Sequence, residues 1–390
     1  MAKPIISAFL LIGAASALDI ATRRGVDGVE VVKARMEGAR TDIAVQRGGC
    51  EELARLSREG RENEAEGPFN QGKYVPTGLL EAGIGEVMSQ GLLSILASAR
   101  ESDDAVFDAA LACKDALRGL LVQNNREKAL AMHRHSPHFW EATVAFVRRY
   151  SRRPQVEGDL CLFAGTYGTF PGSDEPAAAL AEAGGVELLL DLLDQSHTDA
   201  GLMQRVLCAF SDNVQGSKRF ADVMLSHNGV QRFVDDAWAT HPMEHFREGN
   251  GFGLRYEVLE DIIGMMKHDG PDRKNAKAFA AAGLMDVVIK LMPDEPGELY
   301  LQDHCCQVFN YLTNGDVEMQ RKLAGSDGIK FVRDAVEMKC APSCAWPPPV
   351  LGWNKGLTNG TPPPSCQFTL ANYERGLPWH ETWSEAHSHP

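Results

Sequence analysis

A recurring block constrains the fold of this chain more than any other feature. In the stretch EAGGVELLLDLL at 182–193, a glycine pair is followed by apolar residues at i, i+3, i+4 and i+7, starting from Val186. This spacing puts the apolar side chains on one face of an α-helix. Related blocks follow seven glycine or proline positions, which are 42 to 54 residues apart. They are Gly49, Gly91, Pro137, Gly185, Gly229, Gly283 and Gly328.

The spacing of these blocks predicts a repeat protein. A period in the low to middle forties is the length of a solenoid unit of two or three helices. Glycine tolerates left-handed backbone angles, so each glycine is expected to form a corner between two helices. Between corners lie a polar turn, an apolar stretch such as LMQRVLCAFSDNV, and a shorter helix. Strand signals are scarce, so the chain is predicted to be all-α.

The same residues carry a resemblance to a known family. NAKAFAAAGLMDVVIKLM at 275–292 resembles the armadillo repeat signature, in which an Asn precedes a glycine corner and an apolar helix. SKRFADVMLSHNGVQRFVDD and EPAAALAEAGGVELLLDLL are similar. The resemblance covers about residues 30–340 and implies a right-handed α-solenoid of about six to seven armadillo-like repeats. Pro137 departs from the corner pattern, and the first two units are degenerate, which suits a capping role.

Composition divides the chain into three predicted parts. Residues 1–17 have the apolar run and small-residue triplet of a secretory signal peptide; an apolar first helix is the alternative. Residues 18–340 form the predicted repeat array, in which no window is long and apolar enough to span a membrane. Residues 341–390 contain three-proline runs and are expected to form an extended tail. A cleaved signal places the mature chain in the secretory pathway or an organelle lumen; otherwise it is cytoplasmic.

The nine cysteines are compatible with either compartment. Five lie in apolar, helix-like stretches, where a thiol is expected to act as a small hydrophobe. Cys340, Cys344 and Cys366 lie in or beside the tail, where a disulfide among them is expected in a lumen, and thiols in a cytosol. An odd total leaves at least one thiol outside intrachain disulfides. The five in apolar stretches are Cys113, Cys161, Cys208, Cys305 and Cys306.

Signatures of catalysis are missing from the sequence. No nucleophile elbow, zinc-protease or Walker motif occurs, and solenoids seldom enclose a dry pocket, so neither an enzyme nor a cofactor is predicted. GNGFG at 249–253 lacks the preceding strand that a phosphate loop needs. His133, His135 and His138 have spacings that a metal could use. Without a cysteine or carboxylate pattern, they are interpreted as helix-corner residues, and no metal is predicted.

A protein-binding groove is the remaining prediction. In armadillo arrays the third helix of each unit lines the concave side, and here that helix is taken to be the one after each corner. Its acidic and Trp positions suit a basic or extended protein segment, through ion pairs and cation–π contacts. An ordinary solvated helix face is the alternative. The predicted groove residues are Trp140, Glu187, Asp191, Asp194, Asp235, Asp236, Trp238 and Asp286.

These features favour a non-catalytic protein-protein interaction scaffold or adaptor. The net charge of −14 repels phosphate backbones, so no nucleic-acid partner is expected, whereas RRYSRRP at 148–154 could bind an acidic partner. Nuclear import adaptors present Trp and Asn ladders that this sequence does not show. Hsp70 nucleotide-exchange factors with armadillo-like arrays include a lumenal branch, and such a cofactor is the alternative function.

Overall fold

In the residues that it describes, the computed structural model of the chain consists of helices and one short pair of strands. The chain divides into two compact units, Met1–Leu188 and Leu189–Pro390, which are described separately. The predicted signal peptide lies outside the described residues. The structure describes residues 26–59, 62–63, 73–74, 77–98, 102–121, 126–157, 160, 174–196, 199–239, 254–294, 296, 298–337, 363–376 and 378.

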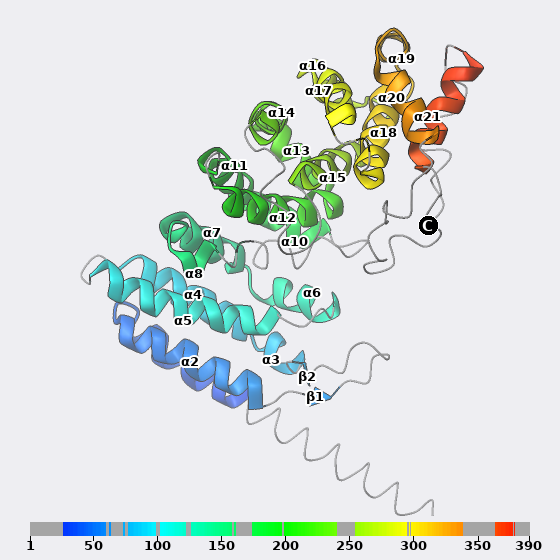
Figure 1. Ribbon diagram of the computed structural model, residues 1–390. Coiled ribbons are helices and arrows are strands. Elements are labelled where there is room, and N and C mark those ends of the chain that lie inside the picture. The colour runs from blue at the N-terminus through cyan, green and yellow to red at the C-terminus, as the bar shows by residue number, and fades with distance from the viewer. Residues whose placement is uncertain are drawn as a thin grey trace, which may run out of the picture. The chain divides into compact units, whose positions relative to one another are not determined.

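The first unit is built on α4, which packs on α2, α5 and α7 (Figure 1). A helix at 26–38 precedes α2, which packs on α4 and α5, while α4 also packs on α7. The strands β1 and β2 form a two-residue antiparallel pair. The elements are α2 (Ile43–Glu59), β1 (Glu62–Asn63), β2 (Lys73–Tyr74), α3 (Thr77–Glu81), α4 (Ile84–Leu96), α5 (Asp103–Leu121), α6 (Arg126–His135), α7 (Phe139–Tyr150), α8 (Pro154–Glu157) and α10 (Asp174–Glu182).

The second unit repeats a pattern of one long and two short helices. The long helices α12, α15 and α18 pack in a row, and α21 packs on α18 at the end of that row (Figure 1). The helix α11 (Gly185–Gln195) begins before the unit boundary and ends after it. The other elements are α12 (Ala200–Gly216), α13 (Lys218–Ser226), α14 (Gly229–Ala239), α15 (Leu254–Lys267), α16 (Lys274–Ala281), α17 (Leu284–Leu291), η2 (Met292–Asp294), α18 (Leu299–Thr313), α19 (Val317–Ala324), α20 (Gly328–Glu337) and α21 (Pro364–Arg375).

Among the later predicted corners, only Gly283 has left-handed backbone angles; Gly184 replaces Gly185 and Asn228 replaces Gly229 in this role, and Gly328 is the first residue of α20. Gly184 and Gly283 have φ of 83° and 87° and directly precede α11 and α17, so a residue without a Cβ makes each turn. The expectation of corners at Gly49 and Gly91 is wrong, because these residues lie inside α2 and α4. A Cβ at either position would overlap the side chain of Met36, so these glycines serve close helix packing.

Buried amide side chains close several of the corners. The last carbonyls of a helix have no partner within it, and leaving a buried one unpaired is costly. In three places an Asn or Gln amide nitrogen donates to such a carbonyl, at 2.8 Å and ten residues earlier in the chain. The donors are Gln46, Asn275 and Gln302, and the acceptors are the carbonyls of Met36, Met265 and Met292.

Disulfides join long helices and correct the prediction for the cysteines. Cys50 on α2 pairs with Cys113 on α5, and Cys306 on α18 pairs with Cys366 on α21. Cys208 is also disulfide-bonded, whereas Cys305 is buried as a thiol. The expectation that Cys113, Cys208 and Cys306 act as simple hydrophobes is therefore wrong, because helix packing places distant cysteines side by side.

The expectation for the C-terminal tail is wrong in part. Residues 364–375 form the helix α21, which begins at a proline and packs on α18 and α20. Proline suits the first turn of a helix because the nitrogens there lack an intrahelical acceptor in any case. Cys366 pairs with Cys306, and not with Cys340 or Cys344, which lie outside the described residues. None of the described helices is long and apolar enough to cross a membrane.

The amide corner at Gln302 can be tested by substitution. Gln302→Leu keeps the volume but leaves the buried carbonyl of Met292 unpaired, so we expect the free energy of unfolding to fall by about 1–3 kcal/mol. Chemical denaturation followed by circular dichroism measures this. Gln195→Leu, at an exposed position on α11, is the control and should change stability by less than about 0.5 kcal/mol. Equal effects of the two substitutions would contradict a role for the corner hydrogen bond.

Candidate protein-binding surface

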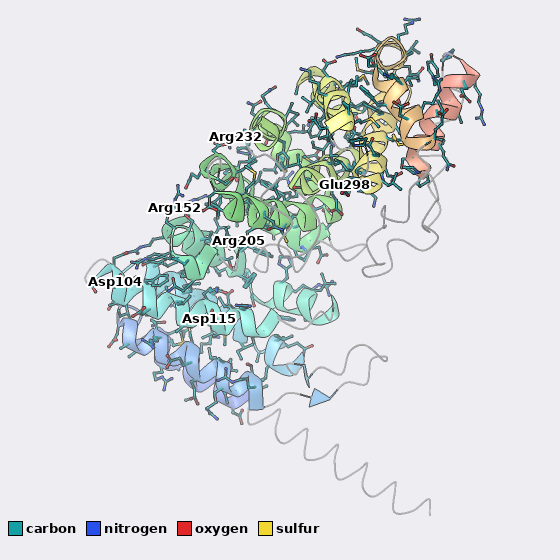
Figure 2. The ribbon with its side chains drawn as sticks, viewed as in Figure 1. Asp104, Asp115, Arg152, Arg205, Arg232 and Glu298 are labelled. Atoms are coloured by element: carbon teal, nitrogen blue, oxygen red, sulfur yellow. A yellow bond between two sulfur atoms is a disulfide. The ribbon has the colours of Figure 1, made fainter. Side chains whose placement is uncertain are left out.

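Two of the predicted groove residues form one ion-paired cluster with an arginine from the next repeat. Asp191 and Asp194 lie on α11, three residues apart and therefore on the same helix face. Arg232, which is labelled in Figure 2, lies on α14. Its Nη1 is 3.9 Å from Asp191 Oδ1 and its Nη2 is 3.1 Å from Asp194 Oδ2. The side chain of Asp191 nevertheless remains 60% exposed. The cluster therefore holds a guanidinium at an accessible position.

Asp286 forms a similar pair further along the second unit. It lies in the first turn of α17, and its Oδ2 accepts a hydrogen bond from Lys322 Nζ on α19 at 2.8 Å. The Asp286 side chain is 56% exposed. Exposed ion pairs contribute about 0–1 kcal/mol each, because water screens them and both side chains lose conformational freedom. The acidic positions thus bind cations of the chain itself, but weakly.

The predicted aromatic contribution to the groove is not supported at Trp140. This side chain is 3% exposed, and its ring lies edge-on to Phe139 with the centroids 4.8 Å apart, so the prediction of an exposed Trp is wrong. Val144 and Val147 follow at i+4 and i+7 and are buried too, which is the sequence signal that places Trp140 in the core stripe of α7.

The remaining predicted groove residues are described less completely. Glu187 lies in the first turn of α11 and is half-buried. Asp235, Asp236 and Trp238 lie on α14, but their side chains are outside the part of the chain that the structure describes. The structure therefore supports accessible acidic positions at Asp191 and Asp194 on α11 and at Asp286 on α17, and the name acidic helix face is used below for these three residues.

The basic stretch 148–154 is used mainly within the first unit. Arg149 donates to Asp103 at 2.9 Å and to the carbonyl of Leu96 at 2.7 Å. Arg153 donates to Asp104 at 2.7 Å. Both aspartates lie in the first turn of α5, where the helix dipole stabilises negative charge. The hydrogen bond from Arg149 lowers the pKa of Asp103. These contacts leave Arg152 as an exposed cation of the stretch (Figure 2).

A pocket of about 370 Å³ opens where α15 and α18 end. Arg273 donates from Nη2 to the carbonyls of Tyr311 and Leu312, both at 2.8 Å, and burial lowers the pKa of its guanidinium. Asp269 accepts hydrogen bonds from the first amides of α16. These charged groups hold helix ends, and Tyr311 and Pro271 lie in the wall of the pocket.

The predicted histidine cluster lies around the turn between α6 and α7. His138 precedes α7, and its backbone nitrogen donates to Glu86 at 3.1 Å. His133 and His135 lie in the last turn of α6. No group of three or more His, Cys, Asp or Glu within the described ranges is placed to hold a metal ion. His133 is half-buried, and burial lowers its pKa.

Comparisons with known proteins add little to this geometry. No protein-family model and no curated protein matches the chain. One crystal structure of an engineered protein from the Northeast Structural Genomics Consortium has a TM-score of 0.49 and 17% identity, covering 80% of this chain and 74% of that chain. Another has a TM-score of 0.46 and 19% identity, covering 73% of this chain and 96% of that chain. Both similarities are too weak to carry an argument about function.

The burial of His133 predicts a pH dependence of stability. Its folded-state pKa is lowered below the ordinary value of 6.5, so the unfolded chain binds the proton more readily, and stability falls as the pH drops below about 6.5. We expect His133→Gln to lose less stability between pH 7 and pH 5 than the unsubstituted chain, in denaturation curves measured at each pH. His135→Gln, at an exposed position on the same helix, is the control. If the stability of all three proteins changed with pH in the same way, protonation of buried His133 would not be the cause of the pH dependence.

Proposed function

We propose that the chain is a non-catalytic scaffold that binds a basic or extended segment of a partner protein through its acidic helix face. The scaffold is a right-handed, armadillo-like array of about six to seven repeats. Its support is the repeated pattern of one long and two short helices, and the corners at Gly184 and Gly283. Such arrays offer an extended surface rather than an enclosed pocket, which suits protein ligands.

One observation carries the binding proposal. Asp191, Asp194 and Asp286 already hold an arginine or lysine of the chain while remaining accessible to solvent. A partner segment rich in Arg and Lys can replace Arg232 and Lys322 at little cost, because the internal pairs are weak. Several such replacements along one segment add up to specific binding.

The disulfides support a location in the secretory pathway or an organelle lumen. Cys50–Cys113 and Cys306–Cys366 join residues 63 and 60 positions apart, and all four residues are in the core. Disulfides of this kind persist in oxidising compartments and are rare in the cytosol. This location agrees with a cleaved signal peptide over residues 1–17.

The second candidate is an Hsp70 nucleotide-exchange cofactor in the lumen. The disulfides favour it because they support the compartment in which one branch of such cofactors acts. Adding the mature chain to a lumenal Hsp70 loaded with labelled nucleotide separates the two functions. Accelerated nucleotide release would support the function as an Hsp70 exchange cofactor. An unchanged release rate would leave the scaffold function as the proposal.

Two variants, one lacking the acidic groups and one lacking their basic partners, test the acidic helix face. We expect Asp191→Asn, Asp194→Asn and Asp286→Asn together to weaken binding of a Lys/Arg-rich fluorescent peptide several-fold in anisotropy titrations at low salt. Arg232→Gln with Lys322→Gln should strengthen it, because the aspartates lose their internal partners. In a pull-down with mass spectrometry, the Asp→Asn variant should recover less of the cellular partners than the unsubstituted chain. The variant with Arg232→Gln and Lys322→Gln should recover more of the same partners.

A matched set of substitutions controls for net charge. Glu318→Gln, Asp327→Asn and Asp334→Asn remove three exposed acidic groups elsewhere on the second unit and should leave binding nearly unchanged. If both triple variants weaken binding equally, the acidic face is an ordinary solvated surface and the proposal is wrong.

Disulfide mapping tests the compartment. Non-reducing digestion of the protein isolated from its native cells should yield the linked peptide pairs Cys50–Cys113 and Cys306–Cys366, together with an N-terminus after Ala17. Recovery of all four cysteines as thiols on an uncleaved chain would place the protein in the cytosol instead.

A further inference from the structure

The helix α21, which the structure describes in full, buries no large apolar side chain where it packs on α18 and α20. Its largest apolar side chains, Phe368 and Leu370, are half-buried. Burial of apolar surface is the main favourable term in helix packing, so this term is limited for α21. The buried residues of α21 are small or polar: Ser365, Cys366, Thr369 and Asn372.

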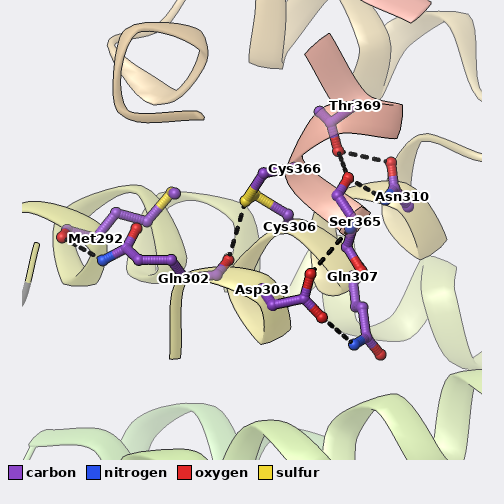
Figure 3. Close-up of a disulfide and its surroundings, with 9 residues drawn as sticks. All are labelled: Met292, Gln302, Asp303, Cys306, Gln307, Asn310, Ser365, Cys366 and Thr369. Atoms are coloured by element: carbon purple, nitrogen blue, oxygen red, sulfur yellow. Dashed lines mark hydrogen bonds between the residues drawn. A yellow bond between two sulfur atoms is a disulfide. The ribbon is translucent and has the colours of Figure 1, made fainter. Parts of the chain in front are cut away.

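Hydrogen bonds between α18 and α21 position the helix but add only modest stability (Figure 3). The Asp303 carboxylate accepts from the backbone nitrogen of Ser365 at 2.9 Å, and it also accepts from Gln307 on its own helix at 2.9 Å. Asn310 donates to the carbonyl of Ser365 at 3.1 Å and accepts from the hydroxyl of Thr369 at 2.8 Å. If α21 leaves, Asp303 keeps its bond from Gln307 and the other groups bond to water, so the net contribution of each bond is modest.

The other disulfide whose pairing is described, Cys50–Cys113, has a different setting. The two disulfides join residues 63 and 60 positions apart, so both restrict the unfolded chain to a similar degree. The helices α2 and α5 pack on each other and on α4, and Leu53 of α2 and Val106 and Leu117 of α5 have no exposed surface. These helices therefore keep apolar packing when their disulfide opens, whereas α21 keeps little.

We propose that Cys306–Cys366 is a redox latch: its reduction releases α21 from α18 and α20 while the rest of the second unit stays folded, and its oxidation docks the helix again. The helix α20 ends at Glu337 and α21 begins at Pro364, so no short turn holds α21 against the helix before it. An isolated helix of 12 residues is marginal in water, so a released α21 also loses its helical hydrogen bonds. The latch does not depend on the proposed binding of a partner protein.

The reductant of the latch is a small monothiol of the glutathione class. Its thiolate attacks one sulfur of the disulfide, forms a mixed disulfide, and releases the other cysteine as a thiolate, which takes up a proton. A second monothiol attacks the mixed disulfide and releases the second cysteine. Two small thiols are thereby oxidised to one small disulfide, and Cys306–Cys366 is reduced to two thiols. Cys366 lies in the first turn of α21, so fraying of that helix end admits the reductant.

Hydrogen exchange in two double variants, measured by mass spectrometry of peptic fragments, tests the latch. With Cys306→Ala and Cys366→Ala, we expect the amides of α21 to exchange at least about ten-fold faster than in the unsubstituted chain, while those of α18 stay protected. The matched control carries Cys50→Ala and Cys113→Ala, and its α2 and α5 should stay protected because apolar packing still joins them. Slow exchange of α21 without its disulfide would overturn the proposal, and so would an equal loss of protection in α2 and α5 of the control.

The unsubstituted chain gives a second measurement that does not depend on how the variants fold. It is equilibrated with glutathione at increasing ratios of thiol to disulfide, and its cysteine thiols are alkylated and mapped. We expect hydrogen exchange of α21 to rise in step with the reduced fraction of Cys306–Cys366, and to fall again after reoxidation. The latch is wrong if this disulfide opens only as the whole second unit unfolds, or if exchange of α21 stays slow after the disulfide has opened.

Discussion

The fold depends on satisfying the ends of many short helices that meet inside the protein. Every helix leaves up to four carbonyls and four amides without partners, so an array of short helices carries this cost at each corner. Here side chains supply the partners: Gln302 donates to the carbonyl of Met292 directly after α17, Arg273 donates to the end of α18, and Asp269 accepts from the start of α16. Apolar burial between helices is non-directional. The corner contacts therefore fix the angle at which one helix follows the next.

A linear array is weakest at its first and last steps, because a terminal repeat has only one neighbour. The two disulfides whose pairing is described lie at such steps in chain order: Cys50–Cys113 joins the early helices α2 and α5, and Cys306–Cys366 joins α18 to the last described helix, α21. A disulfide closing a loop of this length stabilises by about 2–4 kcal/mol, mainly by restricting the unfolded chain. The oxidising compartment that we propose would thus contribute directly to the stability of the ends.

Periodic apolar spacing predicts the helices well, because burial of one face is a local property of the sequence. The same pattern cannot distinguish a glycine that turns the chain at Gly283 from one that admits a neighbouring side chain at Gly91. Cysteine pairing depends on which helices become neighbours, so Cys306 and Cys366 could not be matched from spacing alone. At the candidate site, the surface position of Asp191 follows from the helix period, whereas its arginine partner comes from another repeat and is invisible to a local pattern.

The acidic helix face links stability to the proposed binding. Arg232 on α14 forms ion pairs with Asp191 and Asp194 on α11, and Lys322 on α19 forms an ion pair with Asp286 on α17. When a basic partner segment pairs with these carboxylates, Arg232 and Lys322 lose their ion pairs and face water. The number of ion pairs stays the same, and the partner segment becomes ordered on the surface. Since each internal pair is worth at most about 1 kcal/mol, displacing it opposes binding only slightly. Discrimination must then come from the spacing of several cations along the partner, matched to repeats whose geometry the corner hydrogen bonds hold fixed.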